Sequence, residues 1–177
     1  MVEHRLIKKD KWEYTIVDSD SVKLNLGCGD DILEGWVNCD MYSDNPDVMR
    51  VDLNKLPLPF KDESVDVILL KQVLEHLTVH PFEFINDCYR ILKKDGELVV
   101  ELPAFSFGLA HIRGFHKEDY LSVLYGGKHG NNCYHNRSSF GLISLKKVFS
   151  FRYAVLRILG IVKTLGCENF EWRLRKI

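Results

Sequence analysis

The feature that most constrains this chain is an alternating strand that runs into a glycine turn. In KLNLGCGDD, residues 23–31, Leu24 and Leu26 alternate with polar neighbours, and Gly27 and Gly29 follow with one cysteine between them. Glycine adopts backbone conformations that side chains disfavour, so the chain can turn tightly and approach a ligand closely. In open α/β sheets, small ligands bind beyond such turns, at the carboxyl ends of the strands. The stretch therefore predicts a ligand site built on a strand and its turn.

The next part of the chain alternates strand and crossover signals. Residues 64–70, SVDVILL, form a nearly continuous apolar run, typical of a strand buried on both faces of a parallel sheet. Residues 27–35 are too few for an ordinary helical crossover between the first two strands, so that connection is compressed. The other elements expected are strands at 22–26, 36–40, 48–53 and 97–103, and a helix over about 81–94. The pattern predicts an α/β, Rossmann-like three-layer sandwich with a mostly parallel central sheet.

Charge and cysteine usage disfavour several classes of partner. The 177 residues carry a formal net charge of −1, so nothing attracts the whole chain to nucleic acid or to an anionic membrane. The five cysteines are widely spaced without a CxxC pair, which fits a reducing cytoplasm. The N-terminus lacks the apolar segment of a signal peptide, and no stretch is apolar enough to span a bilayer. We expect a cytoplasmic protein without nucleic-acid or membrane partners; the oligomeric state has no signature in the sequence.

Acidic residues around the turn indicate which ligand it holds. Asp40 ends the second expected strand, where a carboxylate can accept both hydroxyls of a ribose, and Asp52 follows near the third, where it can accept from an adenine amino group. A dinucleotide site needs a third glycine and a helix start facing pyrophosphate, but Asp30 and Asp31 follow Gly29. Carboxylates repel phosphate and tolerate a cationic sulfonium. The turn therefore favours S-adenosylmethionine over NAD or ATP.

Four motifs in order resemble those of class I S-adenosylmethionine-dependent methyltransferases. They are VKLNLGCGD, VNCDM, VDLNKLPLPFKDESVDVILLKQVLEHL and CYRILKKDGELVVELP, which together cover about residues 22–103. The resemblance is closest to the compact small-molecule type with LNLGCG and LEHL motifs. It implies S-adenosyl-L-methionine as cofactor and S-adenosyl-L-homocysteine as product.

The resemblance also implies cofactor contacts at the matching positions. Gly27, Cys28 and Gly29 would line the methionine part of the cofactor, and Asp40 would bind the ribose. The remaining contacts are Met41 over one adenine face, Asp52 and Leu53 at the adenine edge, and Lys71, Gln72 and Val73 beneath the reactive methyl. Two positions depart from the family pattern. Asn25 replaces an acid, which weakens the indirect anchoring of the cofactor's amino group, and Asp31 replaces the third glycine.

The histidines offer one candidate base and weak candidates for metal ligands. A hydroxyl acceptor benefits from a general base, and His76 follows the fourth strand at the edge of the expected site. Glu75 is a second catalytic candidate; alternatively, both residues fix this loop by hydrogen bonds. His76 and His80 lack a third ligand, and the cluster His129, Cys133 and His135 lacks a recognised zinc spacing. We therefore expect no metal.

The chain is expected to form a single domain of three parts. These are an N-terminal extension (1–20), the cofactor-binding core (22–103), and a substrate loop or lid with closing strands (104–177). The third part is expected to hold helices at 117–127 and 140–150, a polar loop at 127–139, and strands at 152–160 and 170–177.

The favoured function is methyl transfer to a small-molecule or saccharide acceptor. Two alternatives stay open: a partner protein that binds the cofactor without catalysis, and a nucleotide- or NAD-dependent enzyme.

Overall fold

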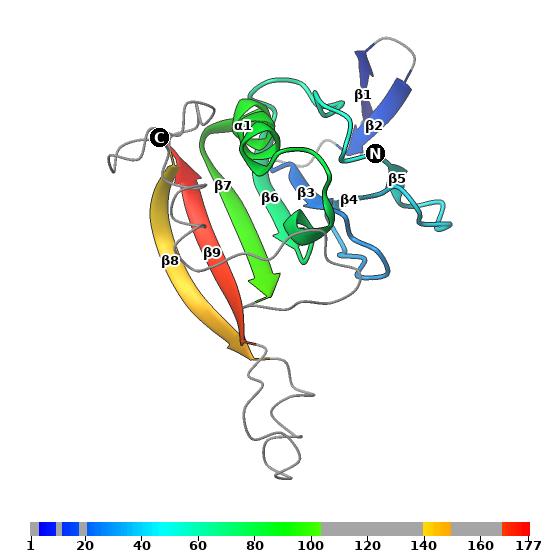
Figure 1. Ribbon diagram of the computed structural model, residues 1–177. Helices are drawn as coiled ribbons and strands as arrows, with labels where there is room; N and C mark the ends of the chain where they lie inside the picture. Colours follow the sequence, from blue (N-terminus) through cyan, green and yellow to red (C-terminus); the bar gives the residue numbers. More distant parts are fainter. Residues whose placement is uncertain (1–3, 10–11, 18–20, 104–139, 150–167) are drawn as a thin grey trace.

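The fold is built on a seven-stranded sheet with the strand order β5-β4-β3-β6-β7-β9-β8 (Figure 1). The computed structural model describes residues 4–9, 12–17, 21–103, 140–149 and 168–177. The strands of the sheet are β3 (Lys23–Leu26), β4 (Val37–Asp40), β5 (Met49–Arg50), β6 (Val65–Lys71), β7 (Leu92–Pro103), β8 (Phe140–Phe149) and β9 (Glu168–Lys176). Within the expected N-terminal extension, β1 (His4–Lys9) and β2 (Trp12–Val17) pair as an antiparallel hairpin.

The sheet is mostly parallel, as the sequence predicts. The strands β5, β4, β3, β6 and β7 run parallel to their neighbours, and β9 is antiparallel to both β7 and β8. From β3 the chain first adds β4 and β5 on one side and then crosses to β6 and β7 on the other. The strand order therefore reverses between β3 and β6, which is the point where open α/β sheets bind ligands.

The helix α1 (Pro81–Ile91) connects β6 to β7 and covers one face of the sheet (Figure 1). His80 caps it, because its Nδ1 accepts from the N–H of Phe82 at 3.3 Å, and Pro81 occupies the first turn. Its buried residues are Phe84, Ile85, Cys88 and Ile91, together with Asp87. The prediction of its start is confirmed, but its end at residue 94 is wrong, because Leu92 is already extended and begins β7.

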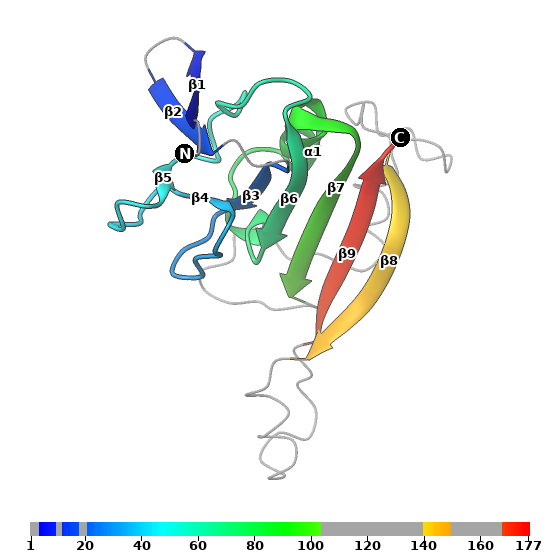
Figure 2. The ribbon, with the colours of Figure 1, turned by 180° about the vertical axis from the view of Figure 1, so that it is seen from behind.

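The main core lies on the α1 side of the sheet, and in the described residues the opposite face carries Val67, Leu69 and Val99 together with charged side chains. In β9, Trp172 and Leu174 are fully buried in the core, whereas Arg173 and Arg175 point to the other face. There both pair with Glu97 of β7, at 3.8 and 3.5 Å. Figure 2 shows this face, along β6, β7, β9 and β8. The described residues thus supply the central sheet and one helical layer.

The prediction of a helix at 140–150 is wrong. Residues Phe140–Phe149 form β8, which pairs with β9 from Phe140↔Lys176 to Phe149↔Glu168. Apolar side chains at 142, 145 and 148 follow a helical spacing, but continuous pairing with a neighbouring strand outweighs that local pattern. The third strand is also shorter than expected, since β5 is only Met49–Arg50. The expected helix at 117–127, loop at 127–139 and strand at 152–160 lie outside the described residues. The expected strand at 170–177 is present as β9, which pairs with both β7 and β8.

Candidate functional site

The turn after β3 contains two glycines with different surroundings. Both have positive φ, +70° at Gly27 and +51° at Gly29. A Cβ at Gly27 would lie 2.7 Å from Cγ2 of Val73, whereas a Cβ at Gly29 would meet nothing within 4 Å. Gly27 therefore lets the end of β3 pack against the segment after β6. Gly29 leaves open space, which a ligand could approach closely.

The carboxylate of Asp40 lies beside this open space. Its Oδ2 accepts the N–H of Gly29 at 3.0 Å, and its Oδ1 accepts the N–H of Tyr42 at 2.7 Å. Each oxygen uses one lone pair in this way and keeps another for a ligand donor. The two backbone bonds hold the carboxylate in one orientation, so it can accept from two adjacent hydroxyls such as those of a ribose.

Asn25 holds the compressed β3–β4 connection together. Its Nδ2 donates to the carbonyl of Asp31 at 2.8 Å and to Oδ1 of Asn38 at 3.0 Å. Asn38 in turn bonds the N–H and carbonyl of Leu33 and the carbonyl of Trp36. Both asparagines are buried. The two side-chain amides thus bond backbone groups that a helical connection would bond within itself. An amide at position 25 can donate these hydrogen bonds, whereas the carboxylate expected from the family pattern cannot.

Restoring the family's acid should therefore harm this chain. We expect Asn25→Asp to lower the free energy of unfolding by about 1–3 kcal/mol, because a buried carboxylate would face two acceptors and donate nothing. Urea denaturation followed by circular dichroism measures this. Glu34→Gln, an exposed change in the same connection, is the control. Unchanged or increased stability of Asn25→Asp would contradict this role of Asn25.

Asp31 does not act as a free acid in the turn. Its Oδ2 pairs with the ammonium nitrogen of Lys71 at 2.6 Å, and this hydrogen bond raises the pKa of Lys71. The sequence suggested that both acids after Gly29 repel a phosphate. Because Lys71 neutralises Asp31, this repulsion comes from Asp30 and Asp40.

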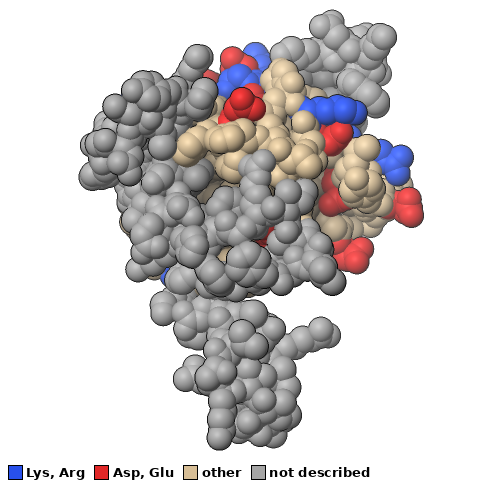
Figure 3. Space-filling view, in the orientation of Figure 1, with Lys and Arg blue, Asp and Glu red and all other residues tan. Residues whose placement is uncertain are grey.

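The turn nevertheless has a negative potential. Burial raises the pKa of the Cys28 thiol, and the carboxylate of Asp40 raises it further. Asp31 and Asp30 act in the same direction. Acidic side chains also lie on the right-hand side of Figure 3, near where the β3–β4 connection runs in Figure 1. A cationic ligand is therefore favoured over an anionic one at this turn.

The residues expected beneath the reactive methyl lie at the carboxyl end of β6. Gln72 has a positive φ of +56°, and its N–H donates to the carbonyl of Glu101 at 2.9 Å. The 3₁₀ helix η1 (Leu74–His76) follows at once and carries both catalytic candidates. Glu75 is 1% exposed, whereas His76 is exposed. Of the two, only His76 has the access that a base needs; its role stays a prediction.

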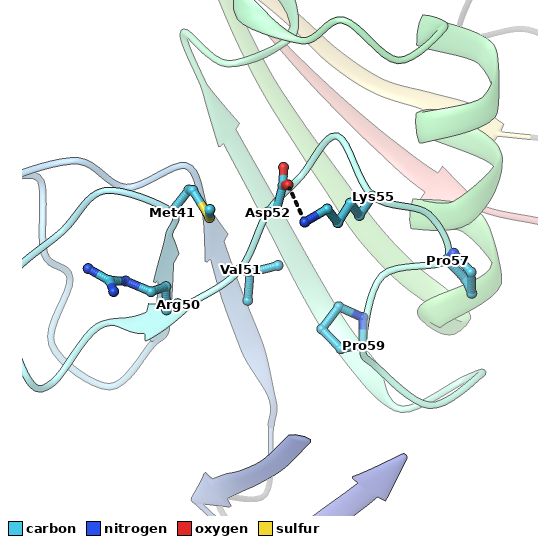
Figure 4. A pocket seen from close by; sticks show the side chains of 7 residues that line it. All are labelled: Met41, Arg50, Val51, Asp52, Lys55, Pro57 and Pro59. Carbon is cyan, nitrogen blue, oxygen red and sulfur yellow. Dashed lines mark ion pairs between the residues drawn. The ribbon is translucent and has the colours of Figure 1, made fainter. Parts of the chain in front are cut away.

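A cavity of about 260 Å³ lies beyond the end of β5 (Figure 4). Ligand pockets commonly measure about 300–1,000 Å³, so this cavity suits one part of a ligand, such as a heterocycle. Met41 and Asp52, both expected to contact adenine, line it. Leu53 does not; it is 7% exposed, in the core beside Gly27. Sequence reasoning gave no ligand contact to the other lining residues, which are Arg50, Val51, Lys55, Pro57 and Pro59.

Asn54 connects the loop after β5 to the segment after η1. Its Oδ1 accepts from the N–H of Thr78 at 2.7 Å, from the Thr78 hydroxyl at 2.9 Å and from the N–H of Val79 at 3.2 Å. Its own N–H donates to Oδ1 of Asp52 at 3.0 Å. The side chain of Asn54 thus fixes the loop expected to contact adenine relative to the segment that carries His76. No sequence motif indicated this role.

The described residues hold neither a cluster of metal ligands nor a helix that could span a membrane. Within them, no three His, Cys, Asp or Glu side chains gather as a metal site. His129, Cys133 and His135 lie outside the described residues. No helix in the described part is long and apolar enough to cross a membrane.

Similar proteins point to one family of domains. Residues 28–100 match the family described as "Methyltransferase domain". A Mycolicibacterium smegmatis protein named "Probable S-adenosylmethionine-dependent methyltransferase" is 33% identical over 103 residues, 45% of this chain and 39% of that protein. A Mycobacterium tuberculosis protein of the same description is 44% identical over 57 residues, 32% of this chain and 20% of that protein. The chain thus spans about two fifths and one fifth of the lengths of these relatives.

Solved structures share the fold. A SAM dependent methyltransferase from Archaeoglobus fulgidus superimposes with a TM-score of 0.57 at 17% identity, covering 88% of this chain and 86% of that one. The [4+2]-cyclase SpnF superimposes with a TM-score of 0.58 at 16% identity, over 88% and 75% of the two chains. The Rossmann-like fold predicted from the sequence is thereby confirmed.

Proposed function

We propose that this chain, whose residues 28–100 form a class I S-adenosylmethionine-dependent methyltransferase domain, transfers a methyl group to a small-molecule or saccharide acceptor. The observation that carries the proposal is the carboxylate of Asp40. It is held by the N–H groups of Gly29 and Tyr42 at the carboxyl end of β4, beside a glycine with open space around it. That arrangement suits the sugar of an adenosyl ligand.

The other residues fit the remaining parts of the cofactor. Met41 and Asp52 line a cavity of suitable size for the adenine ring. The carboxylates around Cys28 supply a negative potential where a sulfonium would lie. S-adenosylmethionine, when bound, supplies a methyl group on a cationic sulfur, and the chemistry then depends mainly on alignment of the acceptor.

His76 would act on the acceptor. For a hydroxyl acceptor, its imidazole would take the proton as the acceptor's oxygen becomes the nucleophile. Its exposed position on η1, directly after the end of β6, supports this role. Asn54 bonds Thr78, which directly follows the short 3₁₀ helix, and so connects this helix to the loop that would contact adenine. This connection would keep the His76 imidazole in a fixed position relative to the cofactor.

Thermal denaturation tests the choice of ligand. We expect S-adenosylhomocysteine or S-adenosylmethionine, at about a hundredfold excess over its dissociation constant, to raise the Tm by about 5–10 °C. NAD and ATP at the same concentrations should cause no comparable rise, because both place phosphates near the acids of the turn. Stabilisation by NAD or ATP, without stabilisation by S-adenosylhomocysteine, would refute the proposal.

A labelled-methyl assay separates catalysis from binding. Transfer of the label from S-adenosylmethionine into a pool of metabolites or saccharides supports the enzymatic proposal. Stabilisation by the cofactor, with no label transferred to any metabolite, saccharide, protein or RNA pool, would instead support a partner protein that only binds it.

A further inference from the structure

The proline-rich wall of the cavity, residues 57–60, presents alternate side chains to two sides. Pro57 and Pro59 line the cavity, whereas Leu58 and Phe60 are buried in the core. A proline has no backbone N–H, so Leu58 carries the one backbone donor of residues 57–59. The position of the wall therefore depends on the groups that bond the backbone of Leu58 and Phe60.

Two side chains of α1 supply these groups. Oδ2 of Asp87 accepts the N–H of Leu58 at 2.6 Å. The guanidinium of Arg90 donates to the carbonyl of Leu58 at 3.1 Å and to the carbonyl of Phe60 at 2.8 Å. Asp87 and Arg90 also pair with each other, with 2.6 Å between Oδ1 and Nε, so each holds the other in place. Figure 4 shows the loop that carries the two prolines beside α1.

We infer that Asp87 and Arg90 are positioning residues for the adenine part of the cofactor. This inference rests on the proposed function, in which the ring occupies the cavity. The described lining of the cavity includes neither side chain. Both act through the backbone of residues 58–60, which sets the positions of Pro57 and Pro59. Because the wall is held before a ligand arrives, binding does not have to order it, and affinity is gained.

The loop that carries the wall is also attached at both of its ends. Before the prolines, Oδ1 of Asn54 accepts from the N–H of Thr78 at 2.7 Å. After them, the N–H of Glu63 donates to the backbone carbonyl of Arg90 at 3.0 Å. The side chains of Asp87 and Arg90 bind the chain between these two points, where the wall lies. Loss of either side chain would therefore free the wall while both ends of the loop stay attached.

Two substitutions release the wall by different routes. In Asp87→Asn, the new NH₂ group must face a donor, because both carboxylate oxygens accept from Arg90 and Oδ2 also accepts from Leu58. In Arg90→Lys the charge remains, but one ammonium replaces a guanidinium that bonds two carbonyls through separate nitrogen atoms. Each variant thus loosens the wall and keeps a polar side chain of similar length on the helix.

Calorimetry with two ligands that share the adenosyl group tests the inference. S-adenosylhomocysteine carries an amino-acid end, and methylthioadenosine lacks it. We expect Asp87→Asn and Arg90→Lys each to weaken binding of both ligands about 5–20-fold, because the wall is in its binding position for a smaller fraction of the time. The factor should be the same for both ligands, since the change lies at the end that they share.

Asp62→Asn is the matched control. Asp62 pairs with the same guanidinium at the same distance of 2.6 Å, but its loss leaves the bonds of Arg90 to the wall in place. Both affinities should stay within about twofold of the wild type, because an exposed ion pair contributes little. Ile85→Val removes one methyl group from the buried face of α1 and controls for lost stability. Circular dichroism at the titration temperature checks that each variant is folded.

The outcomes separate positioning from a purely structural role. If Asp87 and Arg90 only stabilise the fold, their folded variants should lose no more affinity than Ile85→Val, and that result would overturn the inference. A loss confined to S-adenosylhomocysteine would also overturn it, because the effect would then lie at the amino-acid end. A wild type that binds neither ligand would refute the proposed function itself, and with it this inference.

Hydrogen exchange on the wild type gives a readout that needs no variant. Without ligand, the N–H of Leu58 should exchange with solvent about as slowly as the N–H groups of α1, because Asp87 already holds it. Fast exchange of this N–H without ligand, which becomes slow when S-adenosylhomocysteine is added, would show that the ligand orders the wall. That result would contradict the positioning role of Asp87 and Arg90.

Discussion

Replacing Asp40 with alanine is expected to weaken S-adenosylhomocysteine binding by at least about 100-fold. The carboxylate would accept two hydroxyls of the ribose through charge-assisted hydrogen bonds, each worth about 1.5–3 kcal/mol. The variant also leaves the N–H groups of Gly29 and Tyr42 without their present acceptor. The turn would then lose one contact with β4, while the N–H groups of Gly27 and Cys28 still donate to the carbonyl of Cys39. Isothermal titration calorimetry measures the change directly.

The control for Asp40 is Asp47→Ala, a change of the same chemistry at an exposed residue of the following loop. It should bind the ligand with the wild-type affinity. Circular dichroism should show that both variants keep the native fold, because the bonds of Asp40 lie at the surface of the site. An Asp40→Ala protein that is folded and retains affinity within about threefold of the wild type would remove Asp40 from the ribose site.

Gly27→Ala is expected to lower the free energy of unfolding by about 2–5 kcal/mol. A positive φ costs a residue with a Cβ about 1–2 kcal/mol, and forcing an extra methyl into a packed site adds about 1–3 kcal/mol. Here the methyl would lie 2.7 Å from Cγ2 of Val73, a buried and β-branched side chain with little freedom to rotate. Urea denaturation, compared with the wild type, gives the difference.

Gly29→Ala separates backbone strain from the steric clash. Gly29 also has a positive φ, but an added Cβ there would meet nothing within 4 Å, so only the strain of about 1–2 kcal/mol should appear. Adding Val73→Ala to Gly27→Ala should recover part of the lost stability, which a double-mutant cycle measures as a coupling between the two positions. Equal destabilisation by the two glycine changes, with no coupling to Val73, would contradict the packing described here.

Much of the fold can be predicted from local patterns. Three features lie close to their expected places: the buried strand after residue 64, the helix that begins at Pro81 and the acid that ends β4. Each depends on apolar periodicity or helix capping, and both are determined by a few neighbouring residues. The order and spacing of the motifs also resemble one family and imply its cofactor; residues 28–100 match a methyltransferase domain, and the similar proteins carry the name of S-adenosylmethionine-dependent methyltransferases. The cofactor contacts of single residues and the role of His76 stay predictions.

Features that depend on distant residues could not be predicted in this way. The strand at 140–149 has an apolar spacing compatible with a helix, and only its pairing with β9 makes it a strand. The cavity is lined by Met41 and by residues of the segment 50–59, and its shape depends on the path of that segment in the folded chain. The pairing of Asp31 with Lys71 joins residues 40 positions apart, so the charge of Asp31 could not be judged from its neighbours in sequence.

A structure of this chain with S-adenosylhomocysteine tests the central claim most directly. The account predicts that the ligand lies over the turn after β3, with both ribose hydroxyls within hydrogen-bonding distance of the Asp40 carboxylate and the adenine beside Met41. A ligand bound elsewhere on the sheet, or a ribose that does not touch Asp40, would contradict it.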